Sequence, residues 1–432
     1  MKRKLSRFAV PLMLSLTVAL YACGPAEAEP AAGSLVLWED GPTGQGIAVT
    51  SSATGAVGAR LPYGALDRVR SLLYAAVPAT EGASTTVQVY ALPRGGLVRS
   101  TNLAGDFMLA DQSALSFDGR FLVLQERFAP QPGAGYEHQE STFAVLETDL
   151  LSDPVMVTLQ GRFELDALSA GGDNLYLINY LPPYGSGSYQ VRVYDLKAGQ
   201  LLPQAVTEGL DRVKQIVPTM SGTVLQQVVS PEGKWVYSLY LNREHGPFIH
   251  ALDTSSRSSY CIFLPVEHKE DLSLQAFWSL ALSSDGTRLY AANGALGVVQ
   301  EHDTGTRANR TGGFDSVNKN GGATGPEQQP IGNSSGRVAP TFGAALSAED
   351  RILYVLGTRE LHIVDTGSLR PVRVVSLDKA AQGMSLSRDG SALYVITRGP
   401  EPQVLVVDTS SGVTVRTLNV RATNALAVLT SL

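Results

Sequence analysis

The chain has 432 residues, of which 44% are hydrophobic and 17% are charged, and its formal net charge is −6 at pH 7. The hydrophobic fraction suits a globular core, and the sequence offers no basic stripe that could neutralise the phosphates of a nucleic acid partner. The two cysteines, Cys23 and Cys261, are too few for a disulfide framework or a cysteine-based zinc site.

A secretory signal is predicted over residues 1–22. Its basic beginning contains Lys2, Arg3, Lys4 and Arg7. The apolar run over residues 8–22 is short for a transmembrane helix and ends in "LYAC", which resembles the bacterial lipobox. Lipid on Cys23 would anchor the protein at the extracytoplasmic face of a membrane, whereas an ordinary signal peptide would leave it secreted. Residues 23–33 are rich in Pro and Ala and predict a flexible tether.

One phrase recurs along the rest of the chain. "ALSSDGTRLYAANG" starts at Ala281 and returns as "ALSAEDRILYVLG" at Ala345. It returns again as "SLSRDGSALYVIT" at Ser385, which is 40 residues after Ala345. Eight copies of its first element begin at Ala65, Ala114, Ala167, Val228, Ala281, Ala345, Ser385 and Ala425. Self-similarity at such a period indicates a repeat architecture, and the longer intervals contain insertions.

Each copy predicts four short antiparallel strands. A first strand leads into a tight turn of the Asp-Gly type, a β-rich second strand follows, and a third strand ends in Asp-Thr or a related pair. The recurrent acidic residues are interpreted as turn formers: Asp118, Asp285 and Asp389 in the hairpins, and Asp253, Asp303, Asp365 and Asp408 after the third strands. Four strands in about 40 residues describe one blade of a β-propeller, so the predicted fold class is all-β.

The predicted propeller domain spans residues 34–432 and has eight blades, with seven as the alternative. Residues 34–62 supply a second, third and fourth strand with no first strand before them, and Asn424 to Leu432 fall in first-strand phase. We therefore predict that the N- and C-terminal strands share one blade and close the ring. A Gly- and Asn-rich stretch at about 304–340 is too poor in apolar residues to fold alone and is predicted to be a mobile insertion.

The pattern "SxDGxxLYV…VxVxDTxxG" resembles YVTN-type and lactonase-like propeller repeats of secreted bacterial proteins. "SPEGKWVYSLYL" and "PFIHALDT" are also similar to segments of uncharacterised bacterial WD-repeat-like lipoproteins. These resemblances cover nearly the whole chain after residue 34. They imply an architecture and a compartment, and they imply no particular reaction.

Few residues stand out as candidates for a site. Glu164 and Asp166 interrupt the repeat pattern just before a first strand, and first strands line a propeller channel, so these two are the candidate channel residues. His245 lies in a loop that leads into the strand of His250, so both could approach one ligand. Two insertions between second and third strands carry Tyr136, Tyr180, Tyr184 and Tyr189, of which Tyr136 and Tyr184 are the candidate ligand-facing aromatic residues.

No nucleophile elbow, P-loop or dinucleotide-binding fingerprint is present in the sequence, and no metal or cofactor is expected. The sequence therefore favours a membrane-anchored, extracytoplasmic and monomeric propeller that acts as a binding or protein-interaction scaffold. Its partners would be the membrane, through lipid on Cys23, and an unidentified protein or small molecule. The alternative is a lactonase-like hydrolase or another propeller enzyme, with its site at one mouth of the central channel.

Overall fold

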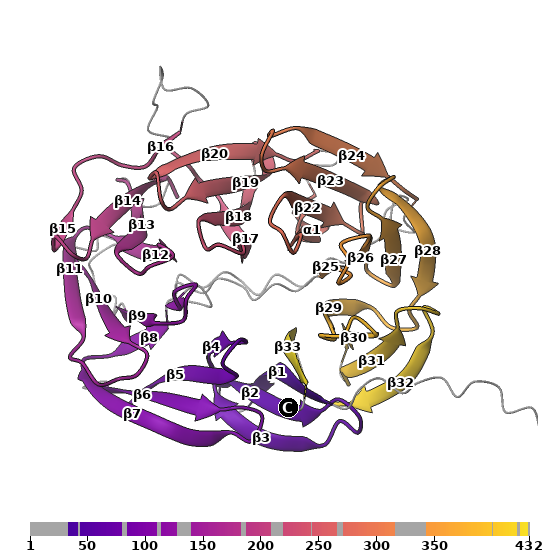
Figure 1. The fold of residues 1–432 in the computed structure, drawn as a ribbon, viewed down its shortest axis with the longest axis horizontal. Coiled ribbons are helices and arrows are strands. Elements are labelled where there is room, and N and C mark those ends of the chain that lie inside the picture. The colour runs from indigo at the N-terminus through magenta and orange to yellow at the C-terminus, as the bar shows by residue number, and fades with distance from the viewer. Residues whose placement is uncertain are drawn as a thin grey trace, which may run out of the picture. The chain divides into compact units, whose positions relative to one another are not determined.

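The structure, a computed structural model, describes residues 33–41, 44–79, 84–109, 114–127, 140–182, 187–208, 219–242, 244–265, 271–315, 343–399, 401–420 and 424–430. Within the compact unit Ala32–Leu432, eight β-sheets are arranged in a ring (Figure 1). Each is built from four antiparallel strands, and one carries a fifth short strand. The unit is therefore an eight-bladed β-propeller, which confirms the predicted fold class and the preferred number of blades.

Blades are numbered here from the first complete one. Blade 1 contains β4 (Gly64–Asp67), β5 (Leu72–Pro78), β6 (Ser84–Ala91) and β7 (Gly96–Ala104). Blade 2 contains β8 (Phe107–Leu109), β9 (Phe121–Glu126), β10 (Glu140–Glu147) and β11 (Val155–Gln160). Blade 3 contains β12 (Phe163–Leu168), β13 (Asn174–Tyr180), β14 (Tyr189–Asp195) and β15 (Gln200–Leu201). Blade 4 contains β17 (Thr223–Val229), β18 (Trp235–Asn242), β19 (Gly246–Asp253) and β20 (Ser258–Phe263), with β16 (Thr207–Glu208) parallel to β20 at its outer edge.

The second half of the ring follows the same order. Blade 5 contains β21 (Trp278–Leu282), β22 (Arg288–Asn293), β23 (Val298–Asp303) and β24 (Asn309–Gly313). Blade 6 contains β25 (Ala344–Leu346), β26 (Ile352–Leu356), β27 (Glu360–Asp365) and β28 (Arg370–Ser376). Blade 7 contains β29 (Ala381–Leu386), β30 (Ala392–Thr397), β31 (Gln403–Asp408) and β32 (Thr414–Asn419). Blade 8 contains β33 (Asn424–Thr430), β1 (Gly33–Gly41), β2 (Gly44–Ser51) and β3 (Val57–Pro62).

The two chain ends close the ring as predicted. Strand β33 is the innermost strand of blade 8 and pairs antiparallel with β1, so that Ser34 lies opposite Leu429 and Leu35 opposite Val428. The C-terminal strand therefore completes the blade that the N-terminal residues begin. This pairing removes two open sheet edges, which would otherwise be free to pair with another chain.

The propeller has two different faces. The hairpin face carries the turns between first and second strands and between third and fourth strands, and the loop face carries the other connections. The chain enters blade 8 at the hairpin face, because Gly33 starts β1 and exchanges hydrogen bonds with Ser52 in the turn after β2. Part of the predicted insertion at 304–340 belongs to a blade, since Asn309–Gly313 forms β24, and residues 316–342 lie outside the described residues.

The repeated turn residues have the predicted role. In blade 5, Ser283 donates to Asp285 at 2.7 Å, and the amide of Arg288 donates to the Ser283 hydroxyl oxygen at 2.9 Å. After the third strand, Asp303 Oδ1 accepts the backbone N–H of Thr306 at 2.7 Å. The Thr304 hydroxyl then donates to the carbonyl of the hairpin glycine at 2.9 Å. The Asp-Thr pair therefore fixes its own turn and ties it to the hairpin.

The core is divided into clusters between neighbouring blades. Several second strands are buried on both faces, as the sequence "ALYVIT" at 392–397 illustrates with six buried residues in succession, whereas the third strands β6 and β14 alternate between buried and partly exposed residues. The fourth strands β28 and β32 are mostly exposed, in keeping with their outer position, whereas β20, which pairs with β16, is mostly buried or partly buried. Blade 2 departs from the repeat, because Leu115 forms only an isolated bridge with Leu122, and Phe107–Leu109 supplies the first strand instead. In the described part of the chain, α1 (Leu272–Gln275) is the one helix, and no helix there has the length and apolar character to cross a membrane.

Candidate functional site

Glu164 lies on the innermost strand of blade 3, as the sequence predicts, but it is partnered within its own blade. Its Oε2 atom accepts a hydrogen bond from the Tyr180 hydroxyl at 2.9 Å, and its Oε1 atom lies 3.3 Å from Arg162 Nη2. The Arg162 guanidinium stacks 4.3 Å from the centre of the Tyr180 ring. The Glu164 side chain is 21% exposed, so the carboxylate is partly buried and is paired with Arg162.

Asp166 is fully buried between blades 3 and 4 and is not exposed to the channel. A β-bulge between Leu165 and Ala167 turns this residue out of the regular alternation. Gln227 of blade 4 donates from Nε2 to the Asp166 backbone oxygen at 3.1 Å and to its Oδ1 atom at 3.2 Å. The position that stood out in sequence is therefore part of the contact between two blades.

The two candidate histidines lie in different surroundings. His245 is on the exposed turn before β19, with its Nε2 atom 3.9 Å from Glu244. His250 is 1% exposed, lies opposite Ser238 in the sheet, and its ring centre is 6.5 Å from that of Tyr240. Among the residues that the structure describes, no three His, Cys, Asp or Glu side chains are grouped closely enough to hold a metal ion.

Aromatic side chains connect the residues selected from sequence. The ring centres of Tyr180 and Tyr189 are 6.0 Å apart, and the Tyr189 and Tyr240 rings are also 6.0 Å apart. Burial raises the pKa of Tyr189 well above its usual value, and contact with Tyr240 and Asp166 raises it further. Glu164, Asp166 and His250 therefore surround one aromatic cluster between blades 3 and 4. Of the remaining candidates, Cys23, Tyr136 and Tyr184 lie outside the described residues.

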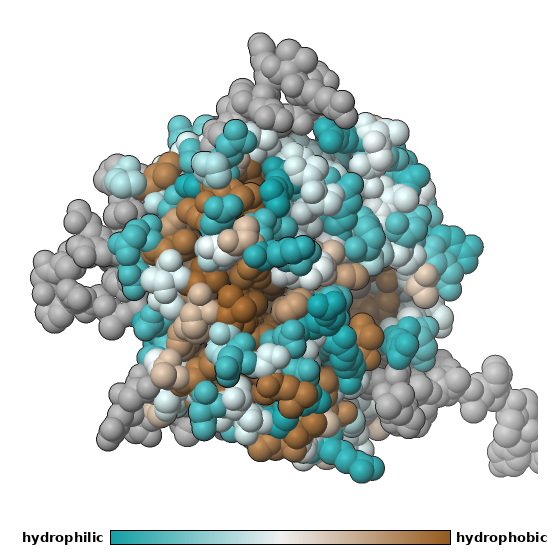
Figure 2. Space-filling model, turned by 60° about the vertical axis from the view of Figure 1, so that its left-hand side comes forward, coloured by the Kyte–Doolittle hydropathy of each residue, from teal (hydrophilic) through white to brown (hydrophobic). Residues whose placement is uncertain are grey.

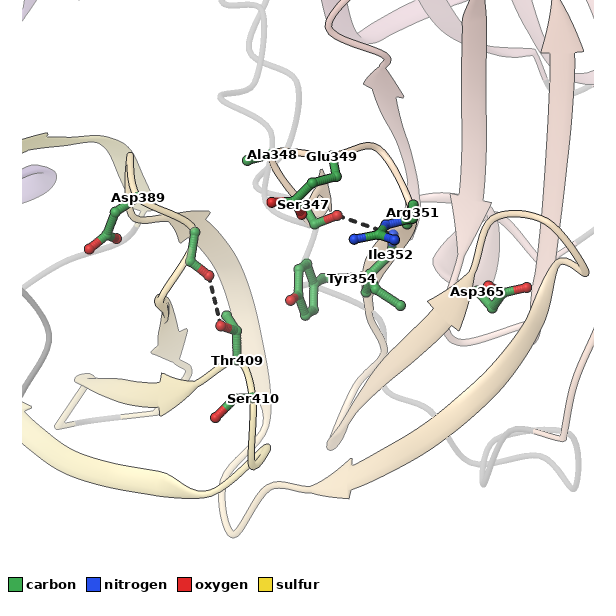
Figure 3. Close-up of a pocket in the computed structure, with 11 residues that line it drawn as sticks. Ser347, Ala348, Glu349, Arg351, Ile352, Tyr354, Asp365, Asp389, Thr409 and Ser410 are labelled. Carbon is green, nitrogen blue, oxygen red and sulfur yellow. Dashed lines mark hydrogen bonds between the residues drawn. The ribbon is translucent and has the colours of Figure 1, made fainter. Parts of the chain in front are cut away.

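A different location holds an open cavity. A groove of about 470 Å³ lies between blades 6 and 7 on the hairpin face (Figure 3). Blade 6 lines it with Ser347, Ala348, Glu349, Arg351, Ile352, Tyr354 and Asp365, and blade 7 with Asp389, Gly390, Thr409 and Ser410. Tyr354 lies between the two walls in the close-up, and the Thr409 hydroxyl of blade 7 donates to the Gly390 carbonyl oxygen at 2.7 Å. This space, which we call the 6–7 groove, is formed by turns of two repeats.

The groove is open because the two hairpins do not touch. A Cβ atom built on the hairpin glycine Gly286 of blade 5 would lie 2.8 Å from Pro231 of blade 4, and one on Gly233 would lie 2.7 Å from Phe117. Gly119 and Gly172 are likewise covered by a neighbouring blade. At Gly390 of blade 7, no atom of a neighbouring described residue lies within 4 Å of that position. The 6–7 groove therefore occupies space that neighbouring side chains fill at these four other hairpins.

Charged groups line the 6–7 groove. Hydrogen bonds from the side chain and backbone of Ser368 lower the pKa of Asp365, and those from Ser387 and Ser391 lower the pKa of Asp389. Both carboxylates are therefore ionised at neutral pH. Glu349 and Arg351 are exposed at the hairpin that forms the blade 6 wall. The groove thus offers mostly negative charge, one guanidinium group and several hydroxyl groups to a polar ligand.

Sequence reasoning did not identify this groove. The individual turn roles of Asp365 and Asp389 were predicted correctly, since their Oδ1 atoms accept hydrogen bonds within their own turns. The sequence contained one indirect sign of the groove, because the hairpin of blade 6 has Asp350 in place of glycine. In the structure, Asp350 Oδ2 accepts a hydrogen bond from the Ser284 amide of blade 5 at 2.9 Å. That contact joins blade 6 to blade 5 on the side away from the groove.

Comparison with known proteins supports the architecture. No protein-family model and no curated protein matches the chain. The dihydro-heme d1 dehydrogenase NirN, solved in complex with DHE, is similar with a TM-score of 0.50 and 14% identity, over 90% of this chain and 73% of that one. Apo AztD from Citrobacter koseri matches with a TM-score of 0.50 and 11% identity, over 91% and 96% of the two chains. At such identities the likeness shows the propeller fold alone.

Proposed function

We propose that the protein is an extracytoplasmic, membrane-anchored β-propeller that acts as a binding or protein-interaction module, and that the 6–7 groove is part of its binding surface. The observation that carries the proposal is the groove itself. Cavities of about 300–1,000 Å³ with a few placed polar groups are typical of ligand sites, and this one has a volume of about 470 Å³.

The use of the recurrent carboxylates supports binding over catalysis. Asp253, Asp303, Asp365 and Asp408 each accept backbone N–H groups of their own turn. A catalytic acid and base pair requires two carboxylates in unlike surroundings, whereas these four share one structural role. Glu164 is held by Arg162 and Tyr180, which gives it a structural role as well.

The anchor is proposed from the "LYAC" sequence at Leu20 to Cys23. Acyl chains contribute about 0.8 kcal/mol per buried methylene, and two or more chains give stable attachment where one is marginal. Cys23→Ala should move the protein from the membrane fraction to the soluble fraction after a high-salt wash. Cys261→Ala, which changes the other cysteine, should leave it in the membrane fraction. Retention of the Cys23→Ala protein in the washed membranes would contradict the anchor.

Binding at the groove is tested by site-specific photo-crosslinking. A photoreactive amino acid at Ala348 faces the groove, and the same residue at Ala170 occupies the equivalent hairpin position in blade 3, where the hairpins are in contact. We expect an adduct of defined mass at position 348 in intact cells, and none of that mass at position 170. Ser410→Trp, which fills the groove from the blade 7 wall, should abolish it. Equal adducts at both positions, or an adduct that Ser410→Trp leaves unchanged, would refute the assignment.

A further inference from the structure

Exposed apolar side chains occur on the outer strands of several blades and do not select one surface. Leu97 and Val155 lie on blades 1 and 2, and Val372 and Val415 lie on blades 6 and 7. On the side that Figure 2 turns forward, hydrophilic residues lie between the apolar patches. Scattered apolar residues of this kind are usual on a protein surface. The feature that distinguishes one part of the ring is the hairpin of blade 7.

The corresponding space between the hairpins of blades 1 and 2 is filled by Arg70. Its Nη1 atom donates to the Gly119 carbonyl oxygen at 2.6 Å, and its Nη2 atom donates to the Asp118 carbonyl oxygen at 2.7 Å. Nη1 also lies 3.1 Å from Asp67 Oδ2. One planar guanidinium group thus binds the carbonyl groups of two consecutive residues, which an ammonium group, as a point charge, does not match.

The hairpin of blade 7 has the same local structure as that of blade 2. The Thr148 hydroxyl donates to the Gly119 carbonyl oxygen at 2.8 Å, and the Thr409 hydroxyl donates to that of Gly390 at 2.7 Å. The two glycines have φ values of 66° and 72°. The serine that begins each hairpin donates to the aspartate two residues later, at 2.7 Å in blade 2 and 2.6 Å in blade 7. The carbonyl groups of Asp389 and Gly390 therefore form the same pair in blade 7.

Blade 6 has an aspartate at the position of Arg70. Counted back from the tyrosine of each second strand, Arg70 of blade 1 corresponds to Asp350 of blade 6. The Asp350 carboxylate accepts hydrogen bonds from Ser284 of blade 5. Arg70 occupies the space beside Gly119, whereas no atom of another blade's described residues lies within 4 Å of the Cβ position at Gly390. Among the described residues, the pair in blade 7 therefore has no counterpart of Arg70.

The charges of the 6–7 groove suit a cation. Glu349, Asp365 and Asp389 line it together with one arginine, Arg351. Burial raises the pKa of Tyr354, and the negative charge of Glu349 raises it further, so this charge acts on the interior of the groove. An aromatic ring and a carboxylate are both favourable neighbours for a guanidinium group.

We propose that the 6–7 groove binds a guanidinium group, which donates to the carbonyl oxygens of Asp389 and Gly390 as Arg70 does to those of blade 2. Glu349 would supply the negative charge. The inference rests on the proposed binding function of the groove and names the chemical group that it recognises. Because the volume is about 470 Å³, the groove also has space for part of the molecule that carries this group. That molecule is either an arginine-containing protein or a small guanidinium compound.

The test compares peptides that differ in one side chain. The purified mature protein is titrated in a calorimeter with a short peptide that has blocked ends and a single central arginine. We expect one-to-one binding. A lysine peptide should bind severalfold more weakly, because an ammonium group lacks the planar fork. A citrulline peptide, which keeps the shape and loses the charge, should bind about tenfold more weakly.

Variants place the binding in the groove. Ser410→Trp should abolish binding of the arginine peptide, because it fills the space. Asp350→Arg should weaken it, because it places in blade 6 the residue that blade 1 has at the equivalent position. Glu349→Gln should weaken it severalfold. Glu232→Gln is the matched control, because Glu232 is exposed at the same hairpin position of blade 4, and it should leave binding unchanged.

Two sources of the guanidinium group are separated by titration with methylguanidinium. If it binds as tightly as the arginine peptide, the guanidinium group supplies all of the affinity, which supports the proposal and indicates a small compound. Tighter binding of the peptide also supports the proposal and indicates a protein partner.

Three results would overturn the proposal: no binding of the arginine peptide, equal binding of the arginine and citrulline peptides, or binding that Ser410→Trp leaves unchanged. Binding by Arg351→Ala and not by the wild type would also overturn it, because Arg351 would then fill the site.

The photo-crosslinking experiment separates this inference from the proposed function. An adduct at position 348 that the arginine peptide does not displace, in isolated membranes, would overturn the guanidinium assignment and leave the binding function intact. Binding of the peptide without any adduct at position 348 would refute the proposed function and support the guanidinium chemistry of the groove.

Discussion

The hydroxyl group of Tyr176 on blade 3 donates a hydrogen bond of 2.6 Å to the backbone carbonyl of Thr254 on blade 4. Tyrosines stand at the same repeat position in other blades, on the second strand and beside the residue that follows the third strand of the next blade. Burial raises the pKa of Tyr74, Tyr290, Tyr354 and Tyr394, and the neighbouring hydroxyl group of Thr148, Thr366, Thr409 or Ser52 opposes that rise. The tyrosine of the repeated "LY" sequence is therefore a recurrent contact between neighbouring blades.

Tyr176→Phe should destabilise the protein. The substitution keeps the buried ring but leaves the Thr254 carbonyl without its donor, and such a loss costs about 1–3 kcal/mol. The free energy of unfolding, measured by denaturant titration, should fall by that amount with no change in the dependence on denaturant. Tyr194→Phe is the control, because the Tyr194 hydroxyl has no hydrogen bond to the described residues. An equal effect of both substitutions would show that the inter-blade bond contributes nothing specific.

Asp350 takes the place of the hairpin glycine in blade 6, which predicts a left-handed conformation because Asp tolerates it better than most residues other than glycine. The structure confirms it, with φ at 56°. The sequence alone predicts that Asp350→Gly is neutral or mildly stabilising. The structure changes this prediction, because the Asp350 carboxylate accepts the Ser284 amide at 2.9 Å and the Ser284 hydroxyl at 2.6 Å. Glycine would relieve backbone strain and lose both hydrogen bonds.

Asp350→Ala separates these two effects. Alanine loses the same hydrogen bonds and also tolerates the left-handed conformation poorly, at a cost of about 1–2 kcal/mol. Thermal unfolding should therefore rank the proteins as wild type, then Asp350→Gly, then Asp350→Ala. If Asp350→Gly is more stable than the wild type, the contact with Ser284 is not stabilising. If glycine and alanine are equal, the backbone conformation is not the one that the structure shows.

The sequence predicted the features that each repeat encodes within itself. Strand alternation, the hairpin turns and the Asx turns are local, so one copy is sufficient to identify them. Closure was also predictable, since Asn424 to Leu432 fall one repeat interval after the previous first strand. The 6–7 groove and the aromatic cluster around Tyr189 depend on contacts between different copies, and no single copy specifies those contacts. Glu301 could have been recognised from the sequence as a departure from the repeat, because other copies have an apolar residue at its position.

Removing the C-terminal strand should unfold or aggregate the protein. Deletion of residues 421–432 removes β33 and leaves the inner edge of β1 without a partner over the register from Gly33 to Trp38. An unpaired sheet edge can pair with another chain, which leads to aggregation. The free energy that the deleted contacts contribute is comparable with the total stability of a typical protein, about 5–15 kcal/mol. Size-exclusion chromatography and thermal unfolding measure the outcome, with deletion of 431–432 alone as the control. A monomeric truncated protein with an unchanged melting temperature would show that the shared blade is dispensable.

His362 should make stability fall in mild acid. Its side chain is fully buried between blades 5 and 6, with the Phe314 ring centre at 4.5 Å, and burial lowers its pKa to about 4 from an ordinary value of 6.5. Its Nε2 atom lies 3.2 Å from Glu360 Oε2, but at neutral pH the imidazole is uncharged, so this contact is not an ion pair.

The direction of the change in stability with pH follows from whether the folded or the unfolded protein binds the proton. Between pH 6.5 and about 4, the unfolded chain takes up a proton at His362 and the folded protein does not, so the free energy of unfolding falls as the pH falls. The loss reaches roughly 3 kcal/mol at about 1.4 kcal/mol per pH unit. His362→Gln should reduce this slope, whatever its effect at pH 7, and the buried His302, whose pKa burial also lowers, should account for part of the slope that remains. His245→Gln, at an exposed turn, should keep it, and an unchanged slope in His362→Gln would contradict the assignment.

Glu301 replaces an apolar residue in the third strand of blade 5. It lies opposite Tyr290, in the position that Ile363 occupies opposite Tyr354 in blade 6. Its carboxylate accepts from Arg288 Nη1 at 2.6 Å and from Arg310 Nη2 at 2.6 Å. Burial raises the pKa of Glu301, but the hydrogen bond and charge of Arg310 outweigh that effect, so the net pKa is lowered and the group is ionised.

Two variants distinguish a required ion cluster from a replaceable one. Glu301→Gln leaves both guanidinium groups facing a neutral amide. Breaking a fully buried pair costs about 3–5 kcal/mol, and we expect about 1–3 kcal/mol here, because both arginines are nearly half exposed. The double variant Arg288→Ile, Glu301→Ile places in blade 5 the residues that blade 6 has at the equivalent positions, Ile352 and Ile363. It should recover most of the lost free energy of unfolding, since an apolar pair can replace a buried ion pair. Arg310 keeps its hydrogen bonds to the carbonyl groups of Thr366 and Gly367 in both variants. Denaturant unfolding measures all three proteins, and a double variant less stable than Glu301→Gln would mean that the ion cluster itself stabilises the contact between blades 5 and 6.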